Sequence, residues 1–272
     1  MRTTPRTRDE EEIAGYRDIL NTIHESHEFI PIKSSYILQL HKELYKYSEK
    51  TFGGRFKNTQ NYIAEVRQDG SKNIRFTPLA PYETPDAIES ICVSYNKMID
   101  ECNVDPLILI PIFITDFLCI HPFNDGNGRM SRLLIALLLY KSGYVVGKYI
   151  SIEKKIEKTK SKYYEVLETV DIGCKNGNND PNVFVKYFLG IILSCYRDFE
   201  DRLVLVENKI LTIEMVKNVI SDKLGKFTKK EINEFIPSKS RASIENSLKS
   251  LVEEGYIERH GKGKATFYTR KF

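Results

Sequence analysis

A polar loop between two apolar stretches constrains the fold of this chain more than any other feature. The loop covers residues 121–132 and reads His-Pro-Phe-Asn-Asp-Gly-Asn-Gly-Arg-Met-Ser-Arg. The flanking stretches, Pro106 to Ile120 and Met130 to Leu139, are rich in Leu and Ile, which predicts two buried core helices. The first of these stretches, the most apolar in the chain, is too short to cross a membrane. Two packed helices would therefore hold the loop rigidly between them.

The loop brings together groups that suit a bound triphosphate. Its Gly-Asn-Gly turn precedes a helix N-terminus, where outward N–H groups and the helix dipole favour anions. Asp125 offers a hard oxygen ligand for Mg²⁺ on phosphates, and Arg129 and Arg132 are spaced to reach those phosphates from one side of the helix. His121 is close enough to accept a proton from a hydroxyl. These residues predict transfer of a phosphorus-containing group.

The same window resembles the core motif of the Fic family, His-x-Phe-x-(Asp/Glu)-Gly-Asn-Gly-Arg-x-x-Arg, at every fixed position. The resemblance implies an all-helical core and transfer of AMP from ATP to a Ser, Thr or Tyr hydroxyl of a target protein or of the chain itself, with release of pyrophosphate. It assigns His121 as the catalytic base and Asp125 as the Mg²⁺ ligand. The motif residues expected around ATP are Phe123 as loop anchor, Asp125, Gly126, Asn127, Gly128, Arg129 and Arg132. Glycine at position 128, where a kinase branch has lysine, favours AMP transfer.

A β-hairpin is predicted upstream of the loop. Asn61 to Val66 is predicted as a strand, Gln68 to Ser71 as a turn with an Asp-Gly pair, and Asn73 to Phe76 as the returning strand. In the Fic family a hairpin called the flap covers the nucleotide here and pairs with the target segment. The resemblance therefore implies that a target protein docks on residues 61–76, with Asn61, Tyr62, Ile63 and Ala64 near ATP. An exposed hairpin without function is the alternative.

Further downstream, Lys160 to Leu167 resembles the family's Tyr-Tyr-x-x-Leu helix. By this resemblance, Tyr163 and Tyr164 would pack near adenine and ribose. Asp171 stands where the family usually has asparagine. Adjacent side chains point in different directions on a helix, so ordinary packing is the alternative for one of the two tyrosines.

The last part of the chain has a different pattern. From about Leu205, three helices precede a glycine- and lysine-rich hairpin around residues 261–264, an order that resembles a winged helix-turn-helix domain. Leu205 to Phe272 contains fourteen Lys and Arg residues against nine Asp and Glu. Because this excess is moderate, DNA binding and protein contact both remain open, with protein contact slightly favoured. Family relatives often dimerise, which makes a homodimer another candidate assembly.

The expected fold is therefore mainly α, with a Fic-type helical core, a β-hairpin flap and a small C-terminal winged-helix domain. We assign residues 1–50 to N-terminal helices that pack on the core, 51–200 to the catalytic domain and 205–272 to the winged helix-turn-helix domain. An apolar stripe at helical spacing places the first helix at Glu11 to Glu28. The stripe consists of Ile13, Tyr16, Ile19, Leu20 and Ile23.

Charge and cysteine content narrow the class of protein. A formal net charge of +4 gives no global signal for polyanion binding. The five cysteines lack metal-ligand spacing and are expected to be reduced thiols. No signal-peptide pattern is visible at the N-terminus, so we expect a cytoplasmic protein without membrane contact.

A regulatory expectation follows from the family pattern (Ser/Thr)-x-x-x-Glu-(Gly/Asn), an inhibitory helix whose glutamate pairs with the last motif arginine. Ser250 to Gly255 matches the pattern but lies in the winged-helix segment, and Thr7 to Glu11 has the spacing without the final Gly or Asn. The chain begins just after the point where such a helix would end. We therefore expect that the chain is truncated or naturally lacks this inhibitory helix, and that Arg132 is available for the γ-phosphate.

Two other functions remain open. A Fic-like domain could act as a nucleotide sensor for a winged-helix transcriptional regulator, or the same pocket could remove AMP from a modified protein. An intact His121 favours the transferase over the sensor, because binding ATP needs no base at that place.

Overall fold

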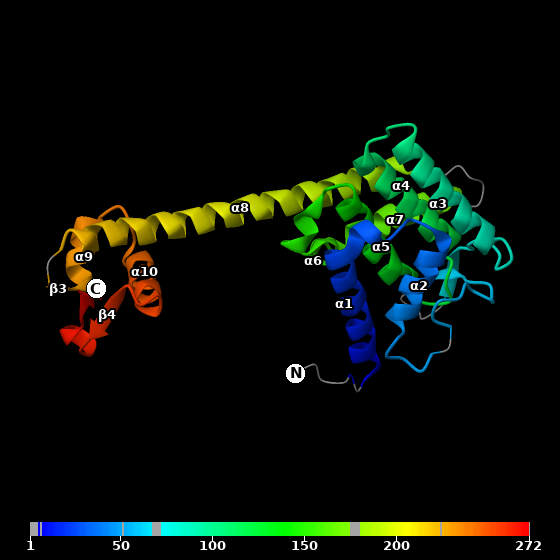
Figure 1. The fold of residues 1–272 in the computed structure, drawn as a ribbon. Coiled ribbons are helices and arrows are strands. Elements are labelled where there is room, and N and C mark those ends of the chain that lie inside the picture. Colours follow the sequence, from blue (N-terminus) through cyan, green and yellow to red (C-terminus); the bar gives the residue numbers. More distant parts are fainter. Residues whose placement is uncertain are drawn as a thin grey trace. The chain divides into compact units, whose positions relative to one another are not determined.

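The computed structural model describes Pro5 and residues 7–50, 52–66, 72–174, 180–223 and 225–271. This part of the chain is mainly helical, as expected (Figure 1). The chain forms two compact units, Met1–Tyr196 and Arg197–Phe272. Each unit has a core of its own.

The first unit is a helical core with one hairpin. Its elements are α1 (Arg8–Ser26), α2 (Ser34–Leu44), β1 (Ile63–Val66), β2 (Lys72–Phe76), α3 (Thr84–Asp100), α4 (Pro106–Ile120), α5 (Asn127–Lys141), α6 (Ile152–Lys158), α7 (Lys160–Cys174) and the first part of α8 (Asn182–Ser221), with short 3₁₀ turns at His27–Phe29 and Val145–Lys148. Helix α5 is central, since every side chain from Leu133 to Tyr140 is buried. Helices α4 and α1 pack against α5, and α3 covers α4. A helix surrounded in this way needs apolar residues on all sides, and this sequence supplies them.

The polar loop is the short connection between α4 and α5. Helix α4 starts with Asp105, whose carboxylate accepts the N–H of Leu107 at 2.8 Å, and with Pro106 at the first helical position. It ends at Ile120, and α5 begins at Asn127. The two predicted core helices are therefore confirmed, and they hold the loop at both ends.

The apolar stripe predicted for the first helix needs one correction. Ile19 and Ile23 are buried as expected, but the side chain of Ile13 is 67% exposed. At this level α1 approaches α2 through Gly15, where a Cβ atom would come within 2.2 Å of the Leu44 carbonyl oxygen. Close contact through a glycine turns the neighbouring isoleucine outward, which helical spacing alone does not predict.

The predicted hairpin is present. β1 and β2 pair antiparallel, with Val66 opposite Lys72 and a register irregularity after Ile63, which lies opposite Phe76. The predicted turn at residues 68–71 lies outside the described residues. The two strands form a sheet of their own within the described residues.

A disulfide joins Cys119 of α4 to Cys174 of α7. The expectation of reduced thiols is wrong for this pair, while Cys92 and Cys102 carry free thiols. The two bonded cysteines are 55 positions apart in sequence, and their pairing depends on how α4 and α7 pack, which cysteine spacing does not reveal. The bond fastens the end of α4, next to the polar loop.

The second unit combines helices with a small sheet. It contains the end of α8, α9 (Lys229–Phe235), α10 (Arg241–Glu253) and strands β3 (Lys226–Phe227), β4 (Ile257–His260) and β5 (Phe267–Arg270), in the antiparallel order β3-β5-β4. Its core consists of Val216, Ile220, Phe227, Ile232, Ile236, Ile244, Leu248, Leu251, Ile257 and Tyr268. The predicted order of helices and terminal hairpin is present, but β3 was not predicted. Helix α8 runs from Asn182 to Ser221 and so passes through residue 205, where the first helix of this part of the chain was expected to begin.

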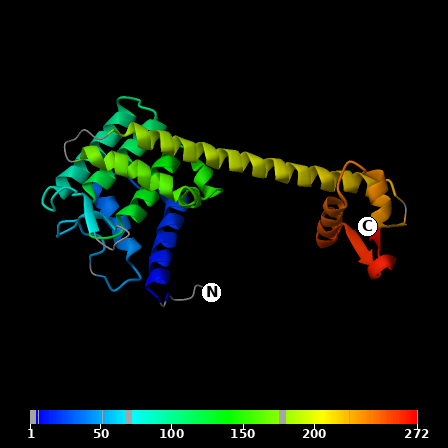
Figure 2. The same ribbon diagram turned by 180° about the vertical axis from the view of Figure 1, so that it is seen from behind.

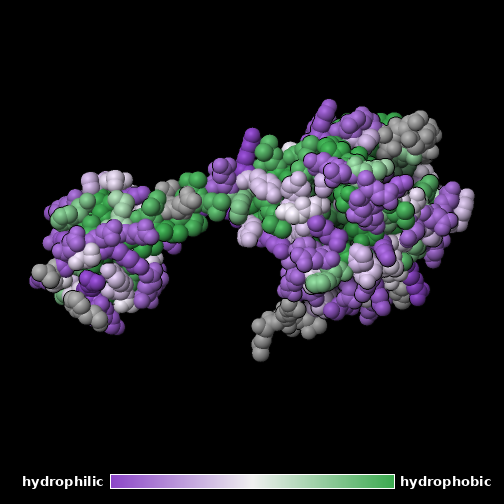
Figure 3. All heavy atoms as spheres, turned by 45° about the horizontal axis from the view of Figure 1, so that its top comes forward, coloured by the Kyte–Doolittle hydropathy of each residue, from purple (hydrophilic) through white to green (hydrophobic). Residues whose placement is uncertain are grey.

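Apolar surface is concentrated on part of α8. Figure 3 shows apolar side chains along this helix, and the exposed ones include Leu203, Val204, Leu205 and Val206. Among the described residues, no helix combines the length and apolar character needed to cross a bilayer.

Candidate functional site

His121 occupies an unusual backbone conformation at the end of α4. Its φ of 52° and ψ of 62° lie in the left-handed region, where glycine or asparagine normally ends a helix. For a residue with a Cβ atom this conformation costs about 1–2 kcal/mol. Such strain persists only where the surroundings enforce it, and it is commonest at functional sites.

The surroundings keep the His121 imidazole neutral. Burial, with the nearby charge of Lys57, lowers the pKa of His121 to about 4. Its Nδ1 lies 3.4 Å from the Leu118 carbonyl oxygen, which favours the tautomer with hydrogen on Nδ1 and a lone pair on Nε2. The buried Lys57 ammonium donates to the Ile120 carbonyl at 2.8 Å. An imidazole in this state can accept a proton at Nε2.

Two asparagines fix the loop between the helices. The Phe123 N–H donates to Oδ1 of Asn127 at 2.9 Å, and Nδ2 of Asn127 donates back to the Phe123 carbonyl at 2.7 Å. Asn61, just before β1, donates to the same carbonyl at 2.7 Å. Both amide atoms of Asn127 are thus engaged in the loop, so contact with a phosphate would fall to its backbone N–H.

His41 is a residue of this site that the sequence analysis did not identify. It is fully buried, and its ring stacks on Phe123 with centroids 3.6 Å apart. Nδ1 accepts the N–H of Gly54 at 3.0 Å, so Nε2 is the donor to the Asp125 carbonyl, also at 3.0 Å. Burial lowers the pKa of His41 to about 4. His41 lies next to Leu40 within residues 1–50, where N-terminal helices are predicted, and a histidine among apolar residues at helical spacing there is the signal that could have marked it.

The N-terminus of α5 lies where an anion nest was predicted. Gly126 has a φ of 88°, and a Cβ atom there would lie 2.9 Å from the Tyr45 hydroxyl, so the position requires glycine. The first bond of the helix runs from the Met130 N–H to the Gly126 carbonyl at 2.8 Å. The N–H groups of residues 127–129 precede that bond and point out of the helix end. A Cβ atom on Gly128 would meet nothing nearer than Arg132 Nη1 at 3.9 Å, which leaves open space over the nest.

Arg129 and Asp125 belong to an ion-pair network whose other members were not predicted. Nη1 of Arg129 lies 3.0 Å from Glu12 Oε2, and its Nη2 donates to the Tyr45 hydroxyl at 2.8 Å and lies 3.4 Å from Asp125 Oδ1. Lys50 Nζ lies 3.0 Å from Asp125 Oδ2. Burial raises the pKa of Asp125, but the hydrogen bond from Lys50 and the charge of Arg129 outweigh it and hold that pKa below its usual value. Only long-range folding brings Glu12, Tyr45 and Lys50 here, and no local pattern marks them.

Arg132 faces a separate hollow of about 450 Å³ that it shares with Tyr163 and Tyr164 of α7. Tyr163 is buried and contacts Phe184 and Tyr187 of α8, which lies against α7 (Figure 2). Tyr164 remains half exposed. The structure thus brings the last motif arginine and both predicted tyrosines to the lining of one hollow.

A third tyrosine, Tyr16, contacts Glu153, which lines this hollow. Tyr16 of α1 donates to Glu153 Oε1 at 3.0 Å, and burial, together with the charge of Glu153, raises its pKa. The charge of Arg132 and a hydrogen bond from its side chain lower the pKa of Tyr16 in part. Arg132 therefore lies close to the Tyr16 hydroxyl. Among the described residues, Glu12 pairs with the motif arginine Arg129. The availability of Arg132 for a γ-phosphate stays a prediction.

The four predicted flap residues differ in their contacts with the loop. Asn61 reaches the loop directly, at 2.7 Å from the Phe123 carbonyl and 3.5 Å from that of His121. Ile63 begins β1, where Ala64 pairs with Ile74. Tyr62 is 57% exposed. The hairpin is therefore attached to the loop through the side chain of Asn61.

Comparison with known proteins agrees with this geometry. Residues 31–139 match the model of the Fic/DOC family. The chain is 28% identical over 151 residues to protein adenylyltransferase fic-1 of Caenorhabditis elegans, covering 56% of this chain and 25% of that protein. It is 33% identical over 115 residues to the probable protein adenylyltransferase aq_aa38 of Aquifex aeolicus, covering 36% of this chain and 35% of that protein. The matched segments thus span about a quarter to a third of these curated relatives.

Solved structures share the fold. A Fic domain containing signaling protein from Bacteroides thetaiotaomicron superimposes with a TM-score of 0.56 at 25% identity, covering 72% of this chain and 74% of that one. A Fic family protein from Desulfovibrio desulfuricans gives a TM-score of 0.60 at 20% identity, covering 99% of this chain and 77% of that one. The second likeness is one of fold alone.

Proposed function

We propose that this chain is a protein adenylyltransferase that transfers AMP from ATP to a Ser, Thr or Tyr hydroxyl of a target protein. The observation that carries the proposal is the six-residue connection between α4 and α5. It holds the neutral imidazole of His121 at one end and the N-terminus of α5, behind Gly126, at the other. A base and an anion nest fixed this close together suit attack of a hydroxyl on a phosphate. The Fic/DOC match and the names of the relatives support the same reaction.

The reaction would proceed by in-line displacement. The hydroxyl oxygen forms a bond to the α-phosphorus of ATP, the bond between that phosphorus and the bridging oxygen to the β-phosphate breaks, and pyrophosphate leaves. His121 Nε2 takes the hydroxyl proton. The pKa of about 4 makes this histidine a weak base in the free protein. The negative charge of a bound triphosphate would raise that pKa towards neutrality, so the base would strengthen when substrate is present.

The carboxylate beside the nest suits a Mg²⁺ ion that would bind together with ATP. Mg²⁺ usually takes one or two carboxylates and completes its shell with phosphates and water, and Asp125 is one carboxylate beside the nest. Among the described residues, no cluster of three or more His, Cys, Asp or Glu could hold a metal unaided. Lys50, now on Asp125 Oδ2, would have to give way. When bound, such an ion neutralises charge that builds up on the phosphates.

The remaining parts of the chain receive proposed roles that follow from this reaction. The flap hairpin, Asn61 to Phe76, would take the target segment as an added strand, because its edges are unpaired within the described residues. Gly126 to Arg129 would hold the inner phosphates, Arg132 the γ-phosphate, and Tyr163 and Tyr164 the adenosine. The second unit would be a winged helix, since helices α9 and α10 precede a two-stranded hairpin. A homodimer is a candidate assembly on the family resemblance alone.

The test is incubation with Mg²⁺ and α-labelled ATP, alone and with a cell lysate. The full chain should label protein, and His121→Gly should abolish labelling. Glycine suits the left-handed backbone at this position, so the variant should keep its fold and its melting temperature. Labelling that survives in His121→Gly would refute the assignment of the base. Label from γ-labelled ATP in place of α-labelled ATP would identify a kinase instead.

A further inference from the structure

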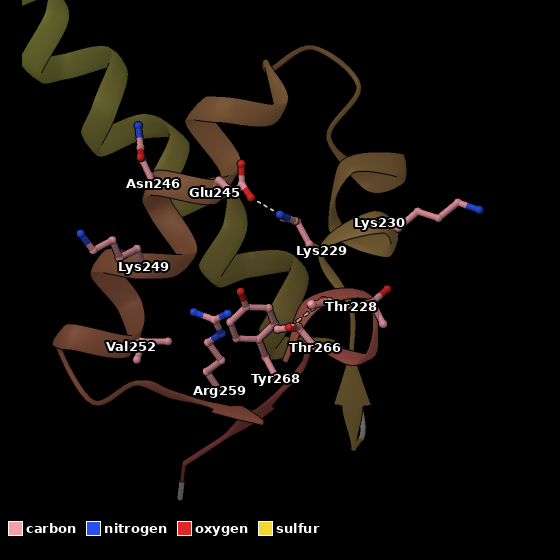
Figure 4. Close-up of a pocket in the computed structure, with 11 residues that line it drawn as sticks. Thr228, Lys229, Lys230, Glu245, Asn246, Lys249, Val252, Arg259, Thr266 and Tyr268 are labelled. Carbon is pink, nitrogen blue, oxygen red and sulfur yellow. Dashed lines mark hydrogen bonds and ion pairs between the residues drawn. The ribbon is translucent and has the colours of Figure 1, made fainter. Parts of the chain in front are cut away.

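A polar groove in the second unit lies apart from the site described above. It has a volume of about 890 Å³ and is lined by residues of α9, α10 and the β4–β5 hairpin (Figure 4). Four lining residues are cationic, Lys229, Lys230, Lys249 and Arg259, and one is a carboxylate, Glu245. Figure 4 shows that this carboxylate is already paired with Lys229. The groove therefore carries an excess of positive charge, which favours a polyanion.

Helix α10 turns a fixed face to this groove. Ile244, Leu248 and Leu251 are buried in the core of the unit. The opposite face is exposed and carries Arg241, Ala242, Glu245, Asn246, Lys249 and Glu253. Thirteen residues make a helix about 20 Å long, and such a cylinder fits a B-DNA major groove. Core packing thus presents a polar helix of suitable size and leaves it uncovered within this unit.

The side chains on the exposed face are of kinds that contact DNA. Asparagine can pair with adenine through two hydrogen bonds, and Arg and Lys contact guanine or phosphates. Asn246 and Lys249 both line the groove. Lys249 lies 3.8 Å from Glu253, an exposed pair of little strength, so its side chain can turn to a phosphate at small cost.

The preceding helix and turn support this arrangement. Helix α9 ends at Phe235 and α10 begins at Arg241, with Ser240 as its cap. Both helices contribute to one core, α9 through Ile232. In a helix-turn-helix of this kind the second helix enters the major groove while the first crosses the backbone, and Lys229 and Lys230 at the start of α9 would then meet phosphates.

The β4–β5 hairpin completes the surface. Its tip contains Gly261 and Gly263, both with positive φ, and exposes Lys262 between them. Arg259 and Thr266 of the hairpin also line the groove, and Figure 4 shows Thr266 next to Thr228 at the start of α9. In Figure 3, hydrophilic side chains cover most of this unit on the face in view. Cations from α9, from α10 and from the hairpin therefore meet at one groove beside the exposed face of α10.

We propose that this groove binds duplex DNA, with α10 in the major groove and the cations of α9 and the hairpin on the phosphates. The proposal uses residues of the second unit alone and does not depend on the transferase reaction. An acidic peptide would complement the positive charge of the groove. It would not require a polar helix that fits a major groove and has an asparagine at its centre.

Fluorescence anisotropy of the full chain with a labelled mixed-sequence duplex, titrated at several salt concentrations, tests the proposal. We expect log affinity to fall linearly with log salt, because phosphate contacts release counterions. Lys249→Ala with Arg259→Ala should weaken binding at least roughly tenfold and reduce the salt slope by about two. Lys46→Ala with Lys97→Ala removes the same charge from exposed positions of the first unit and is the matched control.

Other arms of the experiment distinguish the alternatives. Asn246→Ala should reduce the difference in affinity between duplex sequences and leave the salt slope unchanged. His121→Gly should bind DNA like the unmodified chain, which separates this proposal from the transferase. The absence of salt-dependent binding, equal losses in the groove and control variants, or stronger competition by a polyglutamate peptide than by unlabelled duplex would each overturn it.

Discussion

Arg129 Nη1 lies 3.0 Å from Glu12 Oε2, so a carboxylate from the first helix already neutralises an arginine of the triphosphate nest. The side chains are 17% and 25% exposed, so the pair is only partly open to solvent. A phosphate that reached Arg129 would compete with Glu12. The free protein therefore holds this arginine in place at the expense of its affinity for anions.

Glu12→Gln should therefore tighten ATP binding several-fold, because the guanidinium no longer has an internal counter-charge. The lost pair should lower stability by roughly 1 kcal/mol. Titration of both proteins with ATP and Mg²⁺ by calorimetry measures the change. Glu43→Gln, which removes an exposed carboxylate of α2, serves as the control and should leave affinity unchanged. Weaker ATP binding by Glu12→Gln would show that the pair positions Arg129 for phosphate and does not compete with it.

The two glycines of the nest should respond differently to alanine. Gly126→Ala places a Cβ atom at a φ of 88° and 2.9 Å from the Tyr45 hydroxyl, so it should cost at least about 1–2 kcal/mol and lower the melting temperature. Gly128→Ala meets open space inside a helix and should leave stability equal or higher. It should nevertheless weaken ATP binding, since the added methyl group would occupy open space near Arg132 that the bound phosphates are proposed to fill. Thermal melts and ATP titrations of both variants check this, and equal melting temperatures would contradict it.

The free energy of unfolding should decrease in mild acid. Burial lowers the folded-state pKa of His41 and of His121 to about 4, while in the unfolded chain both titrate near 6.5. The unfolded state therefore binds more protons between these values, and stability that is present above pH 6.5 is lost as pH falls towards 4, by roughly 1–3 kcal/mol for each histidine. Melting temperatures measured across this range should show the decline. His41→Gln should flatten it, and an unchanged slope in that variant would exclude His41 as a cause.

Reduction of the disulfide should lower the stability of the first unit. The disulfide between Cys119 and Cys174 closes a long loop, and bonds of this kind contribute about 2–4 kcal/mol. Cys119→Ser, or dithiothreitol, should lower the melting temperature accordingly. Cys102→Ser, at an exposed free thiol, is the control. No change on reduction, together with two free thiols more than expected in a denatured thiol assay, would show that the bond does not form.

Local sequence alone determined the loop from His121 to Arg132 and the elements that flank it. Apolar runs specify α4 and α5 because a helix buried on all sides needs such runs, and the hairpin follows from an Asp-Gly pair between alternating strands. The nest behind Gly126 follows from a backbone angle that few other residues adopt. Each of these features depends on neighbours within a few positions, so spacing is enough to predict them.

Tertiary structure decided the surroundings of that loop. His41 under Phe123, Glu12 on Arg129, Lys50 on Asp125 and the bond between Cys119 and Cys174 join residues far apart in sequence. Their partners are chosen by how α1, α2 and α7 pack around α5, which no single segment encodes. The outward turn of Ile13 has the same origin, because a glycine contact with α2 sets the rotation of α1. Packing over the whole unit therefore fixes the charge and protonation of the site, while the motif fixes only its backbone.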